Sequence, residues 1–437
     1  MKQKALLIGG GAREHALADA LIAGGAELYA FMANRNPGIY RHCKEFILGS
    51  VTDAAAITNF ARKVKPGFVV IGPEAPLDGG VADELGKEGF SCVGPTKELA
   101  QLETSKSFTR ELMQEHTIQG LPKFKVFSST TGISEWLARL GSYVVKPDGL
   151  TGGKGVKVLG EHLQNDEEAE RYCEEIISQQ GKVVIEEKLE GEEFTLQSLT
   201  DGRNLADCPP VQDHKRAFED DTGPNTGGMG SYSMENHLLP FLTEDDVEEA
   251  HKISGKVLAA LRSEHGIYKG VLYGGFMATA DGIKLLEYNA RFGDPEAMNV
   301  LPLMKTNFVD ACRAVVDGEL DSVEPAFEQK ATVCKYVVPA GYPDKPAIGK
   351  IEMPGAGKGA SHALVYYASV DEKDNGIYTT KSRAVAFVGI ASDIRAAERI
   401  AEDAARSVQG AVYHRKDIGT QPLLQKRVEH LRRLRKR

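Results

Sequence analysis

The chain has 437 residues, of which 42% are hydrophobic and 26% charged, and a net charge of −9 at neutral pH. This composition is typical of a soluble globular protein, the length predicts two to four domains, and the negative charge argues against general nucleic-acid binding. No uninterrupted apolar run approaches the length of a membrane span. Six scattered cysteines without a C-x-x-C pair favour buried thiols in a reducing cytoplasm over disulfides or a zinc site. We therefore expect a cytoplasmic protein that binds neither membrane nor nucleic acid.

Strand and helix patterns alternate in the first hundred residues. Apolar runs predict strands at 4–8, 27–32, 68–71 and 90–93, and a helical pattern covers 13–23. This alternation predicts a doubly wound parallel sheet, in which ligands bind beyond the carboxyl ends of the strands. The glycine-rich loop 9–11 and the turns Gly72-Pro73-Glu74 and Gly94-Pro95 would meet there.

The loop Gly9-Gly10-Gly11 has only part of the dinucleotide-binding pattern. Glu14 replaces the third glycine of the G-x-G-x-x-G fingerprint. Backbone N–H groups before a helix still attract an anion, so a phosphate of a small substrate fits better than a nicotinamide cofactor. The alternative is a plain strand-to-helix turn, and the neighbouring Arg13 and His15 favour the anion site.

A second region begins near residue 103, with a helical pattern to about 113, an extended stretch at 124–127 and a helix around 134–139. Two short β-runs between 143 and 158 then flank a loop that contains glycines at 149, 152, 153 and 155 and is bracketed by Lys146 and Lys154. Such a loop can cover phosphates with backbone donors and positive charge, although it lacks the spacing of a Walker A loop. The two lysines argue against the alternative, a mobile glycine hairpin.

The segment 183–196 is expected to form strand, turn and strand. Adenine recognition needs a backbone donor and acceptor beside apolar walls, and a carboxylate often holds the ribose. Residues Glu186 to Leu189 and Glu193 could supply these groups, although the signal is weak when taken alone.

The strand that begins at 282 leads into a run of polar residues. Side chains alternate along a strand, which predicts one apolar and one polar face. Residues 286, 288 and 290 would form the apolar face, and Glu287, Asn289 and Arg291 the polar face. Carboxylate and amide oxygens suit Mg²⁺, and an arginine can neutralise phosphate. The alternative is an edge strand with a solvated polar face.

The C-terminal part, from about residue 330, has the pattern of a small α/β domain. Strands are expected at 331–338, 361–368 and 384–389, with a helix at 393–407. The segment 426–437 has seven basic residues and one acidic residue. A solvated terminal helix explains this charge better than a surface for RNA or an acidic partner.

Several motifs occur in a characteristic order along the chain. They are Gly-Gly-Ala-Arg-Glu-His from residue 10, Lys-x-Asp-Gly-Leu-x-x-Gly-Lys-Gly from 146, Ile-Glu-Glu-x-Leu-x-Gly-Glu-Glu from 185, Gln-Asp-His-Lys-Arg from 212, Asp-Thr-Gly-Pro-Asn-Thr-Gly-Gly-Met-Gly from 221, Glu-x-Asn-x-Arg-Phe-Gly-Asp-Pro-Glu from 287 and Arg-Lys-Asp-Ile-Gly from 415. Together they resemble the glycinamide ribonucleotide synthetase family, also called phosphoribosylamine–glycine ligases, of the ATP-grasp superfamily. The motifs extend from residue 9 to residue 419, and the run from 212 to 230 is the most specific.

The resemblance implies a multidomain α/β fold. It consists of an N-terminal doubly wound parallel sheet domain that binds phosphoribosylamine (1–102), an ATP-grasp region (103–325, with a lid subdomain at about 124–192) and a small C-terminal α/β domain (326–437). The implied reaction joins glycine to 5-phosphoribosylamine through glycyl phosphate, giving glycinamide ribonucleotide, ADP and phosphate in purine biosynthesis. ATP and Mg²⁺ or Mn²⁺ are the implied cofactors, and a monomer or weak homo-oligomer is expected. The alternatives are an ATP-grasp ligase with another substrate pair and a non-catalytic ATP-binding protein.

The resemblance also implies roles for individual residues. The metal would be held by Glu287 and Asn289. ATP would be bound by Lys106, Lys146, Gly152, Gly153, Lys154, Gly155, Glu186, Leu189 and Glu193. Phosphoribosylamine would be bound by Gly9, Gly11, Arg13, Pro73 and Glu74. The candidates for glycine and its acyl phosphate are Asp213, Lys215, Arg291 and Asp294.

Overall fold

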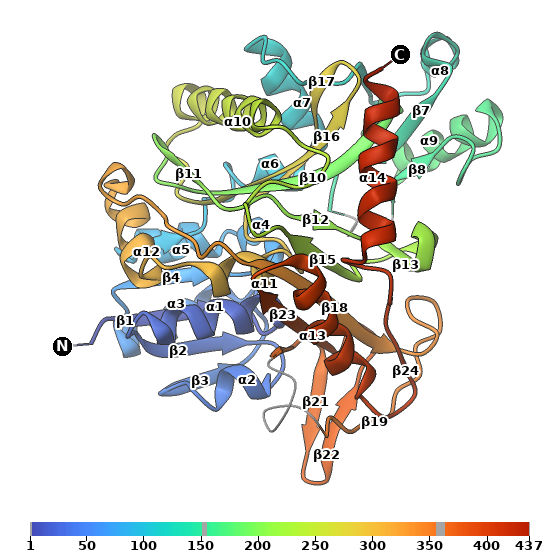
Figure 1. Cartoon of the computed structure of the whole chain (residues 1–437). Coiled ribbons are helices and arrows are strands. Elements are labelled where there is room, and N and C mark those ends of the chain that lie inside the picture. The colour runs from blue at the N-terminus through green and yellow to red at the C-terminus, as the bar shows by residue number, and fades with distance from the viewer. Residues whose placement is uncertain (1, 151–154, 355–362, 437) are drawn as a thin grey trace.

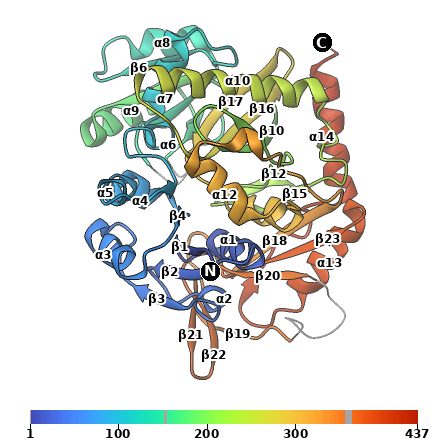
Figure 2. The same ribbon diagram turned by 90° about the vertical axis from the view of Figure 1, so that its left-hand side faces the viewer.

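The computed structural model describes residues 2–150, 155–354 and 363–436, which form three regions packed together (Figure 1). The first region is a parallel sheet with helices on both sides (Figure 2). Its order is β3 (Glu45–Leu48), β2 (Glu27–Met32), β1 (Lys4–Ile8), β4 (Phe68–Ile71) and β5 (Cys92–Val93). Its helices are α1 (Ala12–Ala23), α2 (Pro37–Tyr40), α3 (Ala54–Val64), α4 (Glu74–Asp78) and α5 (Val81–Lys87). The doubly wound parallel sheet predicted from the sequence is confirmed, and the burial of Ala5 to Ile8 explains why this part of β1 is apolar.

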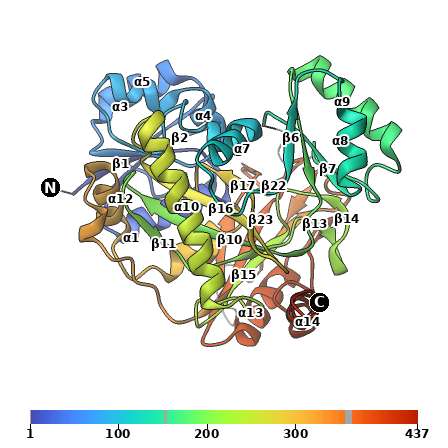
Figure 3. The ribbon, with the colours of Figure 1, turned by 90° about the horizontal axis from the view of Figure 1, so that it is seen from above.

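The second region contains two antiparallel sheets, entered through α6 (Gln101–Thr104) and α7 (Lys106–Glu115). The smaller sheet has the order β6 (Phe124–Phe127), β9 (Val183–Glu187), β7 (Tyr143–Pro147), β8 (Lys157–Val158), and it shares its own hydrophobic core with α8 (Ile133–Leu140) and α9 (Asp166–Gln180). The larger sheet has the order β11 (Leu205–Asp207), β10 (Gly191–Thr200), β16 (Gly270–Thr279), β17 (Gly282–Asn289). Helix α10 (Glu244–Glu264) packs on this sheet (Figure 3). The expected ATP-grasp architecture is thereby confirmed.

The third region is built on a sheet that includes strands from the middle of the chain. Its order is β12 (Gln212–Asp213), β15 (Gly230–Ser233), β18 (Ala331–Pro339), β23 (Val385–Ala391), β20 (Leu364–Tyr367), with β24 (Val412–Tyr413) beside β18. The remaining strands are β13 (Arg216–Phe218) paired with β14 (Thr222–Asn225), and β19 (Lys350–Ile351), β22 (Gly376–Thr379) and β21 (Val370–Lys373) in a small sheet. The remaining helices are α11 (Ala297–Val300), α12 (Phe308–Asp317), α13 (Ile394–Arg406) and α14 (Gln421–Leu434), with 3₁₀ turns at Glu219–Asp221, Leu301–Leu303 and Leu320–Ser322. Because β12 and β15 join this sheet, the Gln-Asp-His-Lys-Arg segment is fixed by the C-terminal region.

Two predicted elements differ from the observed ones. The helix expected from 103 to 113 is two helices that meet at Ser105, which ends α6 and caps α7 by accepting the N–H of Phe108. The strand expected at 90–93 is only β5, because the N–H of Phe90 is bonded to Leu85 in the turn after α5. The strand expected at 361–368 begins in residues outside the described ranges, and its described part is β20.

A β-bulge in β17 alters the predicted division into faces. Phe276 pairs with Leu285, but the preceding Gly275 pairs with Glu287, so Leu286 is an extra residue. Leu286 therefore lines the same pocket as Glu287 instead of joining Tyr288 on the buried face. The prediction for Leu286 was wrong, whereas Tyr288 and Ala290 are buried as predicted.

The basic C-terminal segment forms helix α14, but the prediction that it is solvated was wrong in part. Leu423, Leu424, Leu431 and Leu434 are buried. Arg427 and Arg435 pair with carboxylates of the protein itself. Among the described residues, no helix is long and apolar enough to span a membrane.

Candidate functional site

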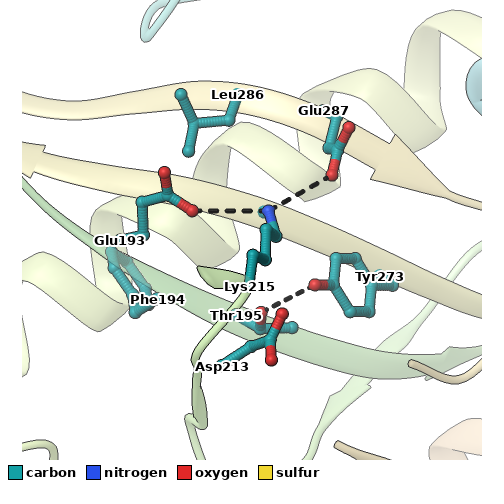
Figure 4. Close-up of a pocket in the computed structure, with 9 residues that line it drawn as sticks. Glu193, Phe194, Thr195, Asp213, Lys215, Tyr273, Leu286 and Glu287 are labelled. Atoms are coloured by element: carbon teal, nitrogen blue, oxygen red, sulfur yellow. Dashed lines mark hydrogen bonds and ion pairs between the residues drawn. The ribbon is translucent and has the colours of Figure 1, made fainter. Parts of the chain in front are cut away.

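A polar pocket lies where the second and third regions meet, and Figure 4 shows its side chains. The strands β10, β16 and β17 form one wall, and the segment that follows β12 crosses it. The lining residues are Glu193, Phe194, Thr195, Asp213, Lys215, Tyr273, Gly275, Leu286 and Glu287. Four of the residues expected at the site, Glu193, Asp213, Lys215 and Glu287, are therefore brought together although they lie far apart in sequence.

Lys215 lies between two carboxylates in this pocket. Its Nζ is 3.3 Å from Oε2 of Glu193 and 3.7 Å from Oε1 of Glu287 (Figure 4). The charge of Glu193, together with that of Glu287, raises the pKa of Lys215 well above its usual value. Burial disfavours ionisation of Glu287, but the positive charges of Lys215, Lys146 and Lys106 hold its pKa below the usual value. Lys215 and Glu287 therefore carry opposite charges at neutral pH.

A second pair of acids lies deeper, at Asp213 and Glu296. Glu296 accepts hydrogen bonds from the Tyr273 hydroxyl (2.7 Å) and the Thr195 hydroxyl (3.4 Å). Oδ1 of Asp213 is buried and has no hydrogen-bond partner among the described residues. Burial and the charge of Glu296 raise the pKa of Asp213 well above its usual value. An unpaired buried carboxyl oxygen costs free energy, so this pocket is suited to a cationic or hydrogen-donating ligand.

Glycine is required where the backbone passes these acids. Gly228 has a φ of +105°, and a Cβ there would lie 2.8 Å from Oδ1 of Asp213. A Cβ on Gly293 would lie 2.3 Å from Oε2 of Glu296. Both glycines belong to motifs on which the family resemblance rests, and the close approach of backbone to carboxylate explains their presence.

Glu186 is the centre of a buried ion pair that joins the two antiparallel sheets. Its Oε1 is 2.7 Å from Nε of Arg110, and its Oε2 is 2.6 Å from Nζ of Lys146. Nη2 of Arg110 also donates to the carbonyl of Leu286 at 2.8 Å. Burial opposes ionisation of Glu186, but Arg110 and Lys146 lower its pKa to about 2. Arg110 was missed in the sequence, where its position one helical turn after Lys106 was the available signal.

Lys106 and Gly149, the first glycine of the loop, lie beside this cluster. Nζ of Lys106 donates to the carbonyl of Gly149 at 3.0 Å, and burial lowers its pKa. The carboxylate of Asp148 accepts the N–H of Ser107 at 2.6 Å, which ties the start of the loop to α7. The candidates Gly152, Gly153 and Lys154 lie outside the described residues, whereas the carbonyl of Gly155 accepts the hydroxyl of Tyr172 at 2.7 Å. Leu189 is half-buried just after β9.

The N-terminal loop packs around Glu14. Oε2 of Glu14 accepts the N–H of Gly11 at 2.6 Å, and its Oε1 accepts Nε of Arg13 at 2.6 Å. A Cβ on Gly9 would lie 2.6 Å from Cγ of Glu14 and 2.8 Å from Cδ of Pro73. Glu14, which replaces a glycine of the dinucleotide fingerprint, therefore fills the space next to the loop.

Two arginines link this loop to the end of β17. Nη1 of Arg13 donates to the carbonyl of Phe292 at 3.2 Å, and its Nη2 is 4.0 Å from Glu74. Arg291 is 2.8 Å from the buried Glu103 and 3.4 Å from Glu74. Burial lowers the pKa of Arg291, but the negative charges of these two glutamates outweigh burial, so the pKa of Arg291 is raised. Glu103 was missed because it lies in a separate helix with no motif of its own.

Asp294 is held by residues of the C-terminal region. Its Oδ1 accepts the Tyr336 hydroxyl at 2.6 Å, and its Oδ2 is 3.1 Å from Nη2 of Arg383. Nη1 of Arg383 also donates to the carbonyls of Gly227, Gly228 and Asp294. Neither Tyr336 nor Arg383 could be found from the sequence, since Tyr336 lies in a strand with an ordinary apolar pattern and Arg383 lies in the loop before β23 with no motif around it.

The pair Glu287 and Asn289 suits a divalent metal that also binds phosphates. They are two residues apart on β17, opposite Gly275 and Tyr273 of β16, so both face the pocket side of the sheet. The amide oxygen of Asn289 accepts a hydrogen bond from Arg291 at 3.4 Å. Among the described residues, Glu287 forms an ion pair only with Lys215, whose side chain is long and flexible. No cluster of three or more His, Cys, Asp or Glu residues in the described ranges could hold a metal by itself. Two hard oxygen ligands match the way in which proteins usually hold Mg²⁺ together with nucleotide phosphates.

Sequence models of three domains match consecutive parts of the chain. Their descriptions are "Phosphoribosylglycinamide synthetase, N domain" (residues 3–103), "Phosphoribosylglycinamide synthetase, ATP-grasp (A) domain" (104–297) and "Phosphoribosylglycinamide synthetase, C domain" (332–421). Together the three models span most of the sequence.

Similar proteins and structures agree with these matches. The phosphoribosylamine–glycine ligase of Methanocella arvoryzae is 50% identical over 435 residues, covering 98% of this chain and 99% of that protein. That of Methanocaldococcus jannaschii is 51% identical over 443 residues, covering 99% and 100%. The structure of phosphoribosylamine–glycine ligase from Thermotoga maritima has a TM-score of 0.80 at 29% identity, covering 95% of this chain and 99% of that one. A biotin carboxylase from Campylobacter jejuni, in a β-γ-ATP complex, is alike in fold alone, with a TM-score of 0.74 at 14% identity and 98% coverage of both chains.

Proposed function

This chain belongs to the phosphoribosylglycinamide synthetase family, and from that premise we propose that it joins glycine to 5-phosphoribosylamine at the expense of ATP. The products are glycinamide ribonucleotide, ADP and phosphate, in a step of purine biosynthesis. The observation that carries this function is the identity of about half of all residues to phosphoribosylamine–glycine ligases over their full length. The pocket at Lys215 supports it with the charges that such a reaction needs.

The reaction needs an activated carboxyl group. Glycine's carboxylate is a poor electrophile, so an oxygen of it first takes the γ-phosphoryl group of ATP, which gives glycyl phosphate and ADP. The amine of phosphoribosylamine then attacks the carbonyl carbon, and the carbon–oxygen bond to phosphate breaks. Phosphoryl transfer depends mainly on positioning and charge neutralisation, so no serine or cysteine nucleophile is required.

On the nucleotide side, we assign phosphate contacts to Lys106, Lys146 and the loop from Gly149 to Gly155. This assignment is supported by the position of both ammonium groups next to the start of that loop and to Glu287. Adenine would lie along Glu186 to Leu189, through the backbone, because the Glu186 carboxylate is occupied by Arg110 and Lys146. Glu193 would take the ribose, exchanging its contact with Lys215 for the sugar hydroxyls.

A divalent metal, Mg²⁺ or Mn²⁺, would neutralise phosphate charge when bound, and we assign it to Glu287 and Asn289. Both oxygens face the pocket, and the positive charges around Glu287 keep its carboxylate ionised. Arg291 holds the amide of Asn289 in place, so it orients a metal ligand in addition to pairing with Glu103.

On the acceptor side, we assign phosphoribosylamine to the loop with Gly9 and Gly11 and to Pro73 and Glu74. The guanidinium of Arg13 is tied to Glu14 and the Phe292 carbonyl, which favours a role in joining the loop to β17 over direct phosphate binding. Asp213, Lys215 and Asp294 remain the candidates for glycine and its acyl phosphate. The unpaired Oδ1 of Asp213 would accept the ammonium group of glycine.

A turnover assay with purified protein tests this function. We expect ADP release that requires ATP, a divalent metal, glycine and 5-phosphoribosylamine together. Release with a different acid or amine, but none with this pair, would favour another ATP-grasp ligase. Binding of ATP without turnover would favour a non-catalytic protein, although Lys146, Glu287 and Asn289, which such a protein could lose, are all present.

The partners on this proposal are small molecules, not nucleic acid or membrane. We further propose a monomer or weak homo-oligomer that works in the cytoplasm. The six cysteines, which are all free, are compatible with a reducing compartment.

A further inference from the structure

Only the first residue of the C-terminal helix α14, Gln421, lies within the residues matched by the family's domain models, and none of the pocket-lining residues belongs to this helix. It packs along β10 and β16 (Figure 1). Along β10, Glu193 and Thr195 line the pocket, and the buried Glu192 points to the opposite side. There Oε1 of Glu192 is 2.6 Å from Nδ1 of His430 on α14. The helix therefore contacts the back of the strand whose front carries Glu193.

The segment after β12 shows the same alternation. Asp213 and Lys215 line the pocket, whereas His214 between them is buried on the other side. The ring of His214 stacks on Tyr232, and its Nδ1 is 3.6 Å from Oδ1 of Asp221. Asp221 thus lies behind the segment 213–215, on the side away from the pocket.

Arg427 of α14 bridges these two back surfaces. Its Nη1 is 3.4 Å from Oε2 of Glu192, and its Nη2 donates to Oδ2 of Asp221. Nη1 of Arg415 pairs with the other oxygen of Asp221 at 3.2 Å. The side chain of Arg427 is only 17% exposed. Its guanidinium therefore connects the strand that carries Glu193 to the segment that carries Lys215. The planar fork of arginine is suited to holding two carboxylates at a fixed separation.

We propose that Arg427 is a positioning residue that sets, from behind the pocket, the distance between Glu193 and Lys215. The proposal rests on the function assigned to this pocket above. Lys215 reaches Glu193 at 3.3 Å and Glu287 at 3.7 Å, so a shift of about 1 Å in its segment breaks both contacts. Misplacement of that size in an active site can reduce turnover about 100-fold. The basic C-terminal helix thus acts on the chemistry without touching a substrate.

The chain offers a matched control on the same helix. Arg435 also pairs with a buried carboxylate, that of Asp246, at 2.6 Å and 2.9 Å, but Asp246 lies in the first turn of α10 and not beside the pocket. With saturating ATP and phosphoribosylamine, we expect Arg427→Met to lower kcat/KM for glycine at least tenfold. Arg435→Met should leave kcat/KM for glycine within about twofold of the wild-type value, although both variants lower the melting temperature. Arg427→Lys keeps the positive charge but not the planar guanidinium, so its kcat/KM for glycine should lie between those of wild type and Arg427→Met.

A second measurement does not depend on turnover. Lys215 is half-exposed, so its amine can be labelled with an acylating reagent and followed by peptide mass spectrometry. Its contacts with Glu193 and Glu287 keep it protonated and slow to react. We expect labelling of Lys215 to be several-fold faster in Arg427→Met and unchanged in Arg435→Met, with other lysines as internal standards.

The outcomes separate the two proposals. Equal losses of kcat/KM in the two methionine variants, with unchanged labelling of Lys215, would overturn the role of Arg427. An inactive wild-type protein whose Lys215 is nevertheless labelled faster in Arg427→Met would support the positioning role and overturn only the proposed function. If Arg427→Met does not fold, Arg427→Lys against Arg435→Lys gives the same comparison in both assays.

Discussion

At the scale of single residues, the pocket is organised by one lysine between two carboxylates. Glu193, Lys215 and Glu287 come from separate segments, and the negative charges of Glu193 and Glu287 raise the pKa of Lys215 well above its usual value. On the proposed function, a metal and phosphates held at Glu287 would give the ammonium of Lys215 new anionic neighbours in place of that carboxylate. The arrangement therefore allows charges to exchange partners without leaving any of them unpaired.

The proposed role of Glu287 as a metal ligand predicts that a substitution there lowers activity far more than stability. Glu287→Gln keeps the shape of the side chain but removes its charge, so we expect turnover to fall about 100-fold or more. Because the Glu287 side chain is 42% exposed, the free energy of unfolding should change by no more than about 1 kcal/mol. ADP release and urea unfolding of the purified variant give the two quantities.

The concentration of Mg²⁺ needed for half-maximal activity supplies the control for this variant. It should rise in Glu287→Gln, since one oxygen ligand has lost its charge. Loss of stability in parallel with turnover, with no change in the Mg²⁺ requirement, would assign Glu287 a structural role.

The candidates that the sequence could provide are those that stand in motifs. Glu193, Asp213, Lys215 and Glu287 were predicted, and the structure places them in one pocket. Glu296 stands at the end of such a motif but was given no role. Glu103 and Arg383 were missed because neither belongs to a motif: Glu103 lies in the short helix α6 and Arg383 in the loop before β23, and the importance of each arises only from tertiary contact.

At the scale of secondary-structure elements, the buried cluster at Glu186 joins four of them. Arg110 comes from α7, Lys146 from β7 and Glu186 from β9, and the carbonyl of Leu286 in β17 accepts from Arg110 and Lys146. The bulge at Leu286 turns that carbonyl toward the two cations. The cluster therefore fixes Lys146 relative to β17.

This cluster predicts a large stability loss from a small change. Glu186→Gln leaves Arg110 and Lys146 buried without an anion, which typically costs about 3–5 kcal/mol. The adjacent Glu187→Gln is the control, because Glu187 pairs with Lys123, whose side chain is 76% exposed. That substitution should cost about 1 kcal/mol or less.

Urea unfolding followed by the fluorescence of Trp136 reports on the right part of the molecule, since the indole N–H donates to the Ile185 carbonyl beside Glu186. Similar losses of unfolding free energy in Glu186→Gln and Glu187→Gln would show that the buried cluster contributes no more to stability than an exposed ion pair. A loss confined to Glu186→Gln is the expected result.

Element positions followed from sequence where a hydrophobic pattern was unbroken. The strands at 4–8, 27–32 and 68–71 were predicted with their observed ends, because their apolar runs are unbroken. Glycine also ends the first run, at Gly9, and bounds the third, at Gly67 and Gly72. The break at Ser105 and the bulge at Leu286 were not predicted. Each depends on a partner distant in sequence, Asp148 for the first and the register with β16 for the second.

At the scale of the whole molecule, the C-terminal region closes over the N-terminal loop. The amide of Asn36 donates to the carbonyls of Gly10 and Tyr367, and Tyr40 donates to Glu372 at 2.6 Å. The N–H of Tyr367 donates to Nδ1 of His15 at 3.0 Å. The proposed phosphoribosylamine loop is therefore held by both regions, which explains why a small C-terminal domain belongs to this enzyme.

His15 makes this contact sensitive to pH. Its ring is buried and stacks on Tyr367, and Nδ1 can accept the N–H of Tyr367 only when it is unprotonated. Burial, and then the charge of His42, lowers the pKa of His15 to about 4, although Asp19 lies 3.8 Å from Nε2. In the unfolded chain the pKa is about 6.5.

The sign of the effect follows from these two values. Below pH 6.5 the unfolded chain takes up a proton that the folded protein does not, so stability falls from pH 6.5 to about 4 and is unaffected above this window. At pH 5 the loss is about 2 kcal/mol. His15→Asn removes the titrating group and retains an acceptor, so its melting temperature should lie below that of wild type at pH 7.5 and the difference should shrink as the pH falls to 5. Groups elsewhere titrate equally in both proteins. A difference in melting temperature that stays constant from pH 7.5 to 5 would therefore show that His15 is not protonated on unfolding. It would also show that the contact between the two regions does not depend on the neutral form of His15.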